Sequence, residues 1–142
     1  MHRDYAGTPL PKKLGIRPDS RVLVVGAPEG FIDGLRAPGA ELVSRIARDL
    51  DVVVLFATKQ AEIRRRFPKI ATSITPDGRI WVCWPKKSSR VMTDADFESV
   101  QRTGLDAGLV DNKSASITDV FQGLQFVRRL KDRPRPAGRP RA

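Results

Sequence analysis

Three runs of consecutive apolar residues constrain the fold of this 142-residue chain more than any other feature. They are RVLVVG (21–26), DVVVLF (51–56) and RIWVCWP (79–85). Because the apolar residues follow one another instead of alternating with polar ones, each strand is expected to be buried on both faces. Strands of this kind belong to parallel sheets that helices cover on both sides.

Helical patterns separate these strands. Pro28 suits the first position of a helix, where its missing N–H is not needed. A second helix is expected from about Lys59, with a kink or a division at Pro68. A third is expected to begin at Thr93, because Asp96 three residues later completes a capping-box pattern. The side chains expected on the buried helix faces are Phe31, Leu35, Ile63, Phe67, Ile70, Ile74, Phe97, Val100 and Leu105.

The remaining strands complete the expected fold. One is expected within ELVSRI (41–46), and two more at 109–117 and 124–130 are close enough in sequence to pair antiparallel. Strands and helices therefore alternate until the last two strands. This order predicts an α/β fold, a mostly parallel Rossmann-like three-layer sheet with an antiparallel C-terminal hairpin at its edge.

The chain divides into three segments by composition. Residues 1–20 are rich in proline and glycine and are expected to form an extended arm, held to the body by Leu10, Leu14 and Ile16. Residues 21–130 are expected to form a single domain. Residues 131–142, KDRPRPAGRPRA, are expected to be a disordered basic tail.

The formal net charge of +10 bears on partners and location. It favours an acidic protein, an anionic ligand or nucleic acid, the last through the tail. The alternative is an ordinary protein with a basic tail. The N-terminus carries no apolar segment and no apolar run approaches the ~20 residues of a membrane span, so we expect a cytoplasmic protein without membrane contact.

Few residues are available for catalysis or metal binding. Cys83 and His2 are the sole cysteine and histidine, so we expect neither a zinc site nor a disulfide. Ser88 and Ser89 have no histidine to activate them, and a pairing with Lys87 is a remote alternative. We therefore expect no catalytic set.

A ligand site is expected where the carboxyl ends of the strands meet. The glycine loop Gly26, Ala27, Pro28, Glu29, Gly30 follows the first of them. Pro28 lacks an N–H for phosphate, and Glu29 would repel one by roughly 4 kcal/mol at 4 Å and an effective dielectric of 20. If this loop binds anything, we expect an amino or cationic group at Glu29.

Lysines are expected at the same edge. Lys59, Lys86 and Lys87 follow the second and third strands. Lys12 and Lys13 join them if the arm folds over this edge. Gathered ammonium groups would bind an anion or an acidic partner, whereas the alternative is a set of separate surface lysines.

Two stretches carry a resemblance to the class I S-adenosylmethionine-dependent methyltransferases. VLVVGAPEG resembles their glycine-rich first motif, and IATSITPDGRIWVCWP resembles a late helix, turn and strand. The resemblance implies a shortened methyltransferase-like fold and cofactor contacts at Gly26, Pro28, Glu29 and Gly30. The chain differs at Val24, where that family has an acid, and Glu41 precedes the second strand although the family's ribose-binding acid follows it.

A second resemblance covers the chain to about Arg129. The phrases YAGTPLPKKLGI, VLVVGAPEGF, WVCWPKK, GLVDNK and GLQFVRR resemble an uncharacterised family of short bacterial proteins. This resemblance implies a bacterial, cytoplasmic, methyltransferase-like domain and no particular reaction.

Three functional hypotheses follow. The first is a non-catalytic, methyltransferase-like binding or regulatory module without a cofactor. The alternative is a minimal methyltransferase that binds S-adenosylmethionine at residues 26–30, with Glu29 on the amino group of its methionine part. The second alternative is weak, sequence-independent nucleic-acid association through residues 131–142.

Overall fold

The structure is a computed structural model that describes residues 8–133. Within this range one six-stranded sheet has the order β2-β1-β3-β4-β6-β5. Strands β2, β1, β3 and β4 are parallel, whereas β6 runs antiparallel to both β4 and β5. This arrangement confirms the predicted fold class. The strands are β1 (Arg21–Val25), β2 (Glu41–Val43), β3 (Leu50–Phe56), β4 (Ile74–Pro85), β5 (Leu109–Ser116) and β6 (Phe121–Arg128).

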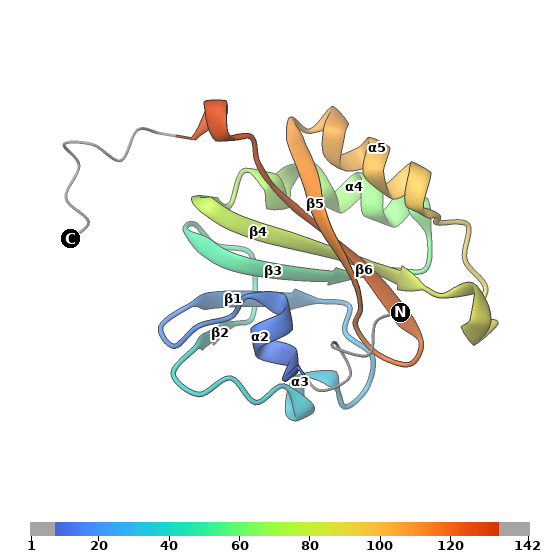
Figure 1. Ribbon diagram of the computed structural model, residues 1–142, viewed down its shortest axis with the longest axis horizontal. Coiled ribbons are helices and arrows are strands. Elements are labelled where there is room, and N and C mark those ends of the chain that lie inside the picture. The colour runs from blue at the N-terminus through green and yellow to red at the C-terminus, as the bar shows by residue number, and fades with distance from the viewer. Residues whose placement is uncertain (1–7, 134–142) are drawn as a thin grey trace.

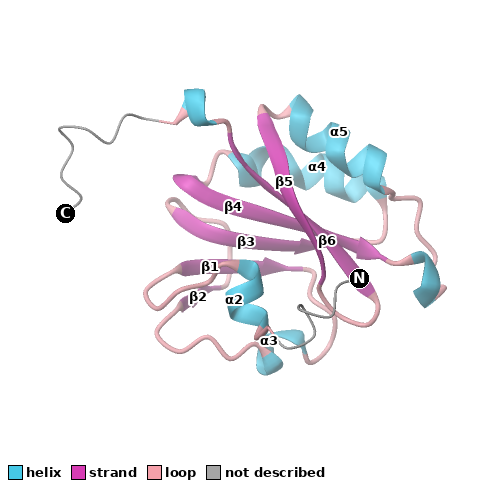
Figure 2. Cartoon of the chain, in the orientation of Figure 1, coloured by secondary structure: helices cyan, strands magenta, loops and turns pink. Residues whose placement is uncertain are grey.

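Helices lie on both faces of the sheet (Figures 1 and 2). One face is covered by α4 (Gln60–Ala71) and α5 (Phe97–Asp106), and the other by the short α2 (Leu10–Leu14) and α3 (Phe31–Gly34). Two 3-10 turns follow β4 and β6, η1 (Lys87–Ser89) and η2 (Leu130–Asp132). None of the helices in residues 8–133 is long and apolar enough to cross a membrane.

The core beneath α4 and α5 lies between the sheet and the two longest helices of residues 8–133. Phe67 of α4 stacks edge-on against Phe126 of β6, with ring centroids 5.3 Å apart. Gly104 of α5 lies directly over the same ring, because a Cβ there would come within 2.0 Å of it. A glycine at this position therefore brings α5 close to the sheet.

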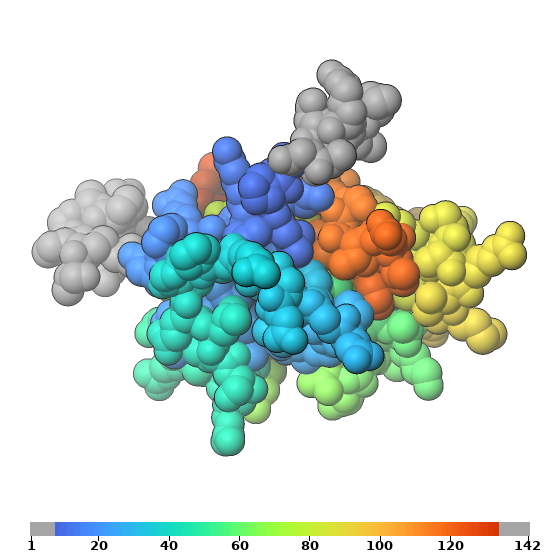
Figure 3. Space-filling model, turned by 90° about the horizontal axis from the view of Figure 1, so that it is seen from below, coloured from blue at the N-terminus to red at the C-terminus, as the bar shows by residue number. Residues whose placement is uncertain are grey.

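The core on the opposite face includes the N-terminal arm. Leu14 and Ile16 are buried, as predicted, and Trp81 donates its indole N–H to the Leu14 carbonyl oxygen at 3.0 Å. In the space-filling view the blue arm lies beside the orange turn that joins β5 and β6 (Figure 3). Trp84 points to the other core, so the two tryptophans of β4 are both buried on opposite faces. Residues 8–20 of the arm are thus a packed part of the domain and include the short helix α2, where an extended segment was expected.

The helix that follows the glycine loop after β1 begins later than expected. The prediction that this helix begins at Pro28 is wrong, because α3 begins at Phe31. Gly30 has a left-handed backbone with φ of 84°, which no α-helix accommodates. Pro28 lies in the preceding turn, where its carbonyl oxygen accepts from the Phe31 N–H at 3.0 Å.

The second helix, α4, is continuous through Pro68, so the predicted division of this helix does not occur. Ile63, Phe67 and Ile70 form its buried face, as predicted, whereas Ile74 begins β4.

The third helix, α5, begins later than expected and buries another face. Its N-cap is Asp96, whose carboxylate accepts from the Ser99 N–H at 2.8 Å, so the Thr93 capping box is wrong. Val100 is buried as predicted, but Phe97 and Leu105 are 49% and 37% exposed. The close fit of Gly104 against the sheet places the neighbouring Leu105 toward the helix flank.

The two ends of the predicted domain organisation lie partly outside the described residues. Lys131 and Asp132, predicted to begin the disordered tail, belong to η2. Residues 1–7 of the predicted arm and 134–142 of the predicted tail are outside the described range.

Candidate functional site

A pocket lies beside β1, at the point where successive strands are added on opposite sides of the sheet. From β1 the chain crosses to β2 on one side, and it then returns to β3 on the other. In open α/β sheets this point leaves a crevice beyond the carboxyl ends of the strands. A cavity of about 340 Å³ occurs there, which we call the switch-point pocket. Its lining includes Gly26, Phe56, Thr58, Lys59, Glu62 and Phe121.

Gly26 shapes one wall of the switch-point pocket. Its φ is 70°, in the left-handed region that glycine adopts without strain. A Cβ on this residue would lie 2.6 Å from the Phe56 carbonyl oxygen. Glycine is therefore required for the loop after β1 to pass so close to the end of β3.

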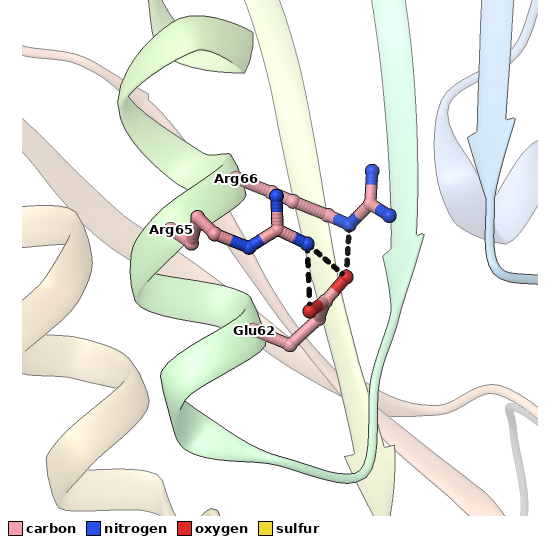
Figure 4. Close-up of polar contacts among 3 residues, drawn as sticks. All are labelled: Glu62, Arg65 and Arg66. Atoms are coloured by element: carbon pink, nitrogen blue, oxygen red, sulfur yellow. Dashed lines mark hydrogen bonds and ion pairs between the residues drawn. The ribbon is translucent and has the colours of Figure 1, made fainter.

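Glu62, in the first turn of α4, lines the switch-point pocket. Arg65 and Arg66 of the same helix both bind it, Arg65 through one nitrogen 2.9 Å from each carboxylate oxygen (Figure 4). The side-chain hydrogen bonds from Arg65 and Arg66 hold the pKa of Glu62 below its usual range. The pocket therefore contains a permanent carboxylate at neutral pH.

A larger groove adjoins this pocket. It has a volume of about 1140 Å³ and lies between α2, the end of β4, the start of α5 and the β5–β6 hairpin. We call it the β4 groove. Thr93, which lines the groove, donates its hydroxyl to the carbonyl oxygen of Thr58, which lines the switch-point pocket, at 2.6 Å. The two hollows are therefore neighbours along one edge of the sheet.

The β4 groove collects three of the five predicted lysines. Lys13 donates to the Ser116 carbonyl oxygen at 3.0 Å, and Lys86 donates to the Ser116 hydroxyl at 2.7 Å. Lys87 also lines the groove, whereas Lys59 lines the switch-point pocket. Lys12 is exposed and lines neither hollow. Of the two arm lysines, Lys13 thus reaches the predicted edge and Lys12 does not.

The crowding of positive charge affects one of these lysines. Burial lowers the pKa of Lys13 first, and the charges of Lys86 and Lys113 lower it further. A negatively charged group near Lys13 would oppose this effect.

Of the predicted glycine loop, Gly26 alone lines the switch-point pocket. Pro28, Glu29 and Gly30 are not among its lining residues, and the Glu29 side chain is exposed. Glu62 of α4 is the acidic residue that lines the pocket instead of Glu29. Glu62 is not among the residues predicted from the sequence, where its one signal is its place three positions after Lys59, in the first turn of the next helix.

The other reactive groups have structural roles. Cys83 is fully buried, which raises the pKa of its thiol. Ser89 donates its hydroxyl to the Lys86 carbonyl oxygen at 2.7 Å. Asp94 accepts from the Gln60 N–H at 2.7 Å and so caps α4 from outside the helix. Within residues 8–133 no three His, Cys, Asp or Glu residues are grouped to hold a metal ion.

The end of β2 differs from the cofactor site that the methyltransferase resemblance implies. Ser44 and Arg45 follow this strand directly. Glu41 lies at its start, where its carboxylate is 3.5 Å from Arg21 Nε. The carboxylate of β2 is therefore at the edge of the sheet opposite the switch-point pocket.

Comparison with known proteins identifies the fold. No protein-family model and no curated protein sequence matches this chain. Solved structures do match it. The magnesium protoporphyrin IX methyltransferase of Synechocystis with bound SAM has a TM-score of 0.59 and 12% identity, over 84% of this chain and 74% of that one. The chain has a methyltransferase-like Rossmann fold.

Two further structures agree with this fold. The TehB-like SAM-dependent methyltransferase of Corynebacterium glutamicum matches with a TM-score of 0.56 and 13% identity, over 89% of this chain and 92% of that one. The fibrillarin pre-rRNA processing protein of Methanococcus jannaschii matches with a TM-score of 0.57 and 12% identity, over 85% of this chain and 69% of that one.

Proposed function

We propose that this chain binds S-adenosylmethionine in the switch-point pocket and acts as a minimal methyltransferase. The observation that carries the proposal is the position of this pocket, at the strand-order reversal of a methyltransferase-like sheet. Similar structures whose names state SAM-dependent methyl transfer or bound SAM support it. These similarities favour a methyltransferase over the non-catalytic module that the sequence led us to expect.

The lining of the pocket fits the amino-acid end of the cofactor. Glu62 would hold its ammonium group and Lys59 its carboxylate, while Phe56 and Phe121 supply apolar surface. The absence of a side chain at Gly26 leaves room for the ligand beside the loop. When bound, S-adenosylmethionine supplies a methyl group on a positively charged sulfur, and the aromatic rings would keep water away from it.

The adenosine end of the cofactor would be held less firmly. Ser44 and Arg45 follow β2, so the strand provides no carboxylate for the ribose. A hydrogen bond to a charged group contributes about 1.5–3 kcal/mol, or roughly ten- to a hundredfold in affinity. We therefore expect binding in the micromolar range rather than tighter.

Isothermal titration with S-adenosylmethionine and with its demethylated product, S-adenosylhomocysteine, tests the proposal. We expect Glu62→Gln to weaken binding about tenfold or more, because the ammonium group loses its charged partner. Glu29→Gln is the matched control, since Glu29 is exposed outside the pocket, and its affinity should equal that of the unaltered protein. No heat of binding with either compound at about 1 mM would refute the proposal.

A second candidate function is a non-catalytic module that binds a ligand in the same pocket. The observation that favours it is the double arginine partnership of Glu62, which leaves less of its charge for a cofactor. Tritiated S-adenosylmethionine, offered with a panel of small carboxylic acids and phosphates, separates the two. Methyl transfer to a panel member establishes the methyltransferase, whereas binding without transfer supports the module.

We further propose that the chain is related to the short bacterial proteins that it resembles, and that it acts in the cytoplasm. Nucleic-acid association through residues 131–142 is a separate one, supported by the basic composition of this segment. Deleting residues 131–142 should abolish salt-dependent binding to a DNA duplex in a fluorescence-anisotropy titration. Binding that survives the deletion would exclude the tail.

A further inference from the structure

Two lysines from distant parts of the chain meet at one serine. Lys13 of α2 and Lys86 at the end of β4 donate to the carbonyl and hydroxyl oxygens of Ser116, at 3.0 and 2.7 Å. The docking of α2 that brings Lys13 here is fixed by the buried Leu14 and its hydrogen bond from Trp81. The fold therefore brings α2 and the end of β4 to the same serine.

The surroundings of this pair concentrate positive charge. Lys87 lines the same groove, and the charges of Lys86 and Lys113 already act on Lys13. Keeping like charges together is unfavourable, and an anion placed among them relieves the repulsion.

The acidic residues of the β4 groove are occupied at helix starts. Asp94 accepts from the Gln60 N–H at 2.7 Å, and Asp96 accepts from the Ser99 N–H at 2.8 Å. Glu98, in the first turn of α5, is the third carboxylate of the groove. The two aspartates are held at the starts of α4 and α5, whereas Lys13 and Lys86 meet at Ser116 of the β5–β6 hairpin.

The rest of the β4 groove suits an apolar group. Its volume of about 1140 Å³ is slightly above the range for small-molecule sites, about 300–1000 Å³, so it has room for one. Pro85 and Ala95 form buried apolar wall, and the half-exposed ring of Phe97 stands at the rim. The groove thus offers a positive end and an apolar flank.

We propose that the β4 groove binds a small molecule whose anionic group, a carboxylate or a phosphate, lies between Lys13 and Lys86 while its apolar body packs along Pro85 and Phe97. The hydrogen bond from Thr93 to Thr58 joins this groove to the switch-point pocket. The bound molecule is then the methyl acceptor, and this role alone rests on the proposed function. Anion binding stands without it.

Titration by two-dimensional ¹H–¹⁵N NMR, without S-adenosylmethionine, tests the site with benzoate, phenyl phosphate and the neutral benzamide. Benzoate or phenyl phosphate should shift the amide signals of Lys86, Ser116 and Gly123, and the tighter of the two identifies the anion type. Benzamide should bind at least about tenfold more weakly, because it lacks the charge. Equal binding of benzamide, or no shifts with any compound at about 20 mM, would overturn the proposal.

Two neighbouring lysines of α2, Lys13 and Lys12, provide a matched test variant and control. Lys13→Gln and Lys86→Gln should each weaken the preferred anion about tenfold, whereas Lys12→Gln removes the same charge from the exposed side of α2 and should change nothing. Circular dichroism checks that each variant is folded. An equal loss in Lys12→Gln, or no loss in the two groove variants, would contradict the proposal. These titrations contain no cofactor. A negative result would therefore refute anion binding in the β4 groove without bearing on S-adenosylmethionine binding, and a negative result with S-adenosylmethionine would not bear on anion binding.

Discussion

Replacing Gly26 by alanine tests the wall of the switch-point pocket. The left-handed backbone at this residue, with φ of 70°, costs an alanine about 1 kcal/mol. The added Cβ would also lie 2.6 Å from the Phe56 carbonyl oxygen, and crowding in a packed region costs typically 1–3 kcal/mol. Together these effects predict a loss of about 2–4 kcal/mol in the free energy of unfolding.

Gly30→Ala is the matched control for this prediction. Gly30 also has a left-handed backbone, with φ of 84°, but its Cβ would meet no atom within 4 Å. It should therefore lose about 1 kcal/mol, from the backbone alone. Urea unfolding followed by the fluorescence of the buried Trp81 and Trp84 measures both variants. Equal losses in the two variants would refute the close approach of this loop to β3.

Three further substitutions or reactions test other parts of the structure. Asp94→Ala should destabilise the protein by about 1 kcal/mol in thermal unfolding, because the Gln60 N–H loses its acceptor, and an unchanged midpoint would contradict this cap. Gly104→Ala should lose about 1–2 kcal/mol, since overpacking against Phe126 exceeds the gain in helix propensity, and a stabilised variant would show that α5 lies further from the sheet. Cys83 should resist Ellman's reagent until urea unfolds the chain, because burial both shields the thiol and raises its pKa. Rapid stoichiometric reaction of the native protein would contradict its burial.

The sheet was predictable because short local patterns in the sequence indicate its strands. The consecutive apolar residues of DVVVLF indicate a strand buried on both faces, and β3 is such a strand. The nearness of the last two strands in sequence also indicated their antiparallel pairing, which the structure confirms. Local periodicity and short connections were sufficient for these features.

Helix boundaries were less predictable, because they depend on individual backbone angles and contacts. The left-handed Gly30 moves the start of α3 from Pro28 to Phe31. The contact between Gly104 and Phe126 sets the buried face of α5. These residues belong to α5 and β6, which are not consecutive in the chain, so the sequence does not indicate the contact. Apolar spacing alone therefore assigned Leu105 to the wrong side.

Both hollows lie at the edge of the sheet where the sequence led us to expect a ligand site, but only some of the expected residues line them. Lys13 reaches Ser116 because α2 docks through Leu14 on Trp81, a contact between residues far apart in sequence. Glu62 lines the switch-point pocket from the first turn of α4, whereas Glu29 in the glycine loop is exposed and does not. Which of these two carboxylates lines the pocket depends on the short approach of that loop to β3, and sequence spacing does not reveal it.

The most direct test of the central claim is to locate S-adenosylmethionine on the protein. Intermolecular nuclear Overhauser effects between the cofactor and the aromatic side chains report direct, short-range contacts. We predict contacts with the ring protons of Phe56 and Phe121, which line the switch-point pocket. Contacts with Phe97 of the β4 groove and none with Phe56 or Phe121 would contradict the account.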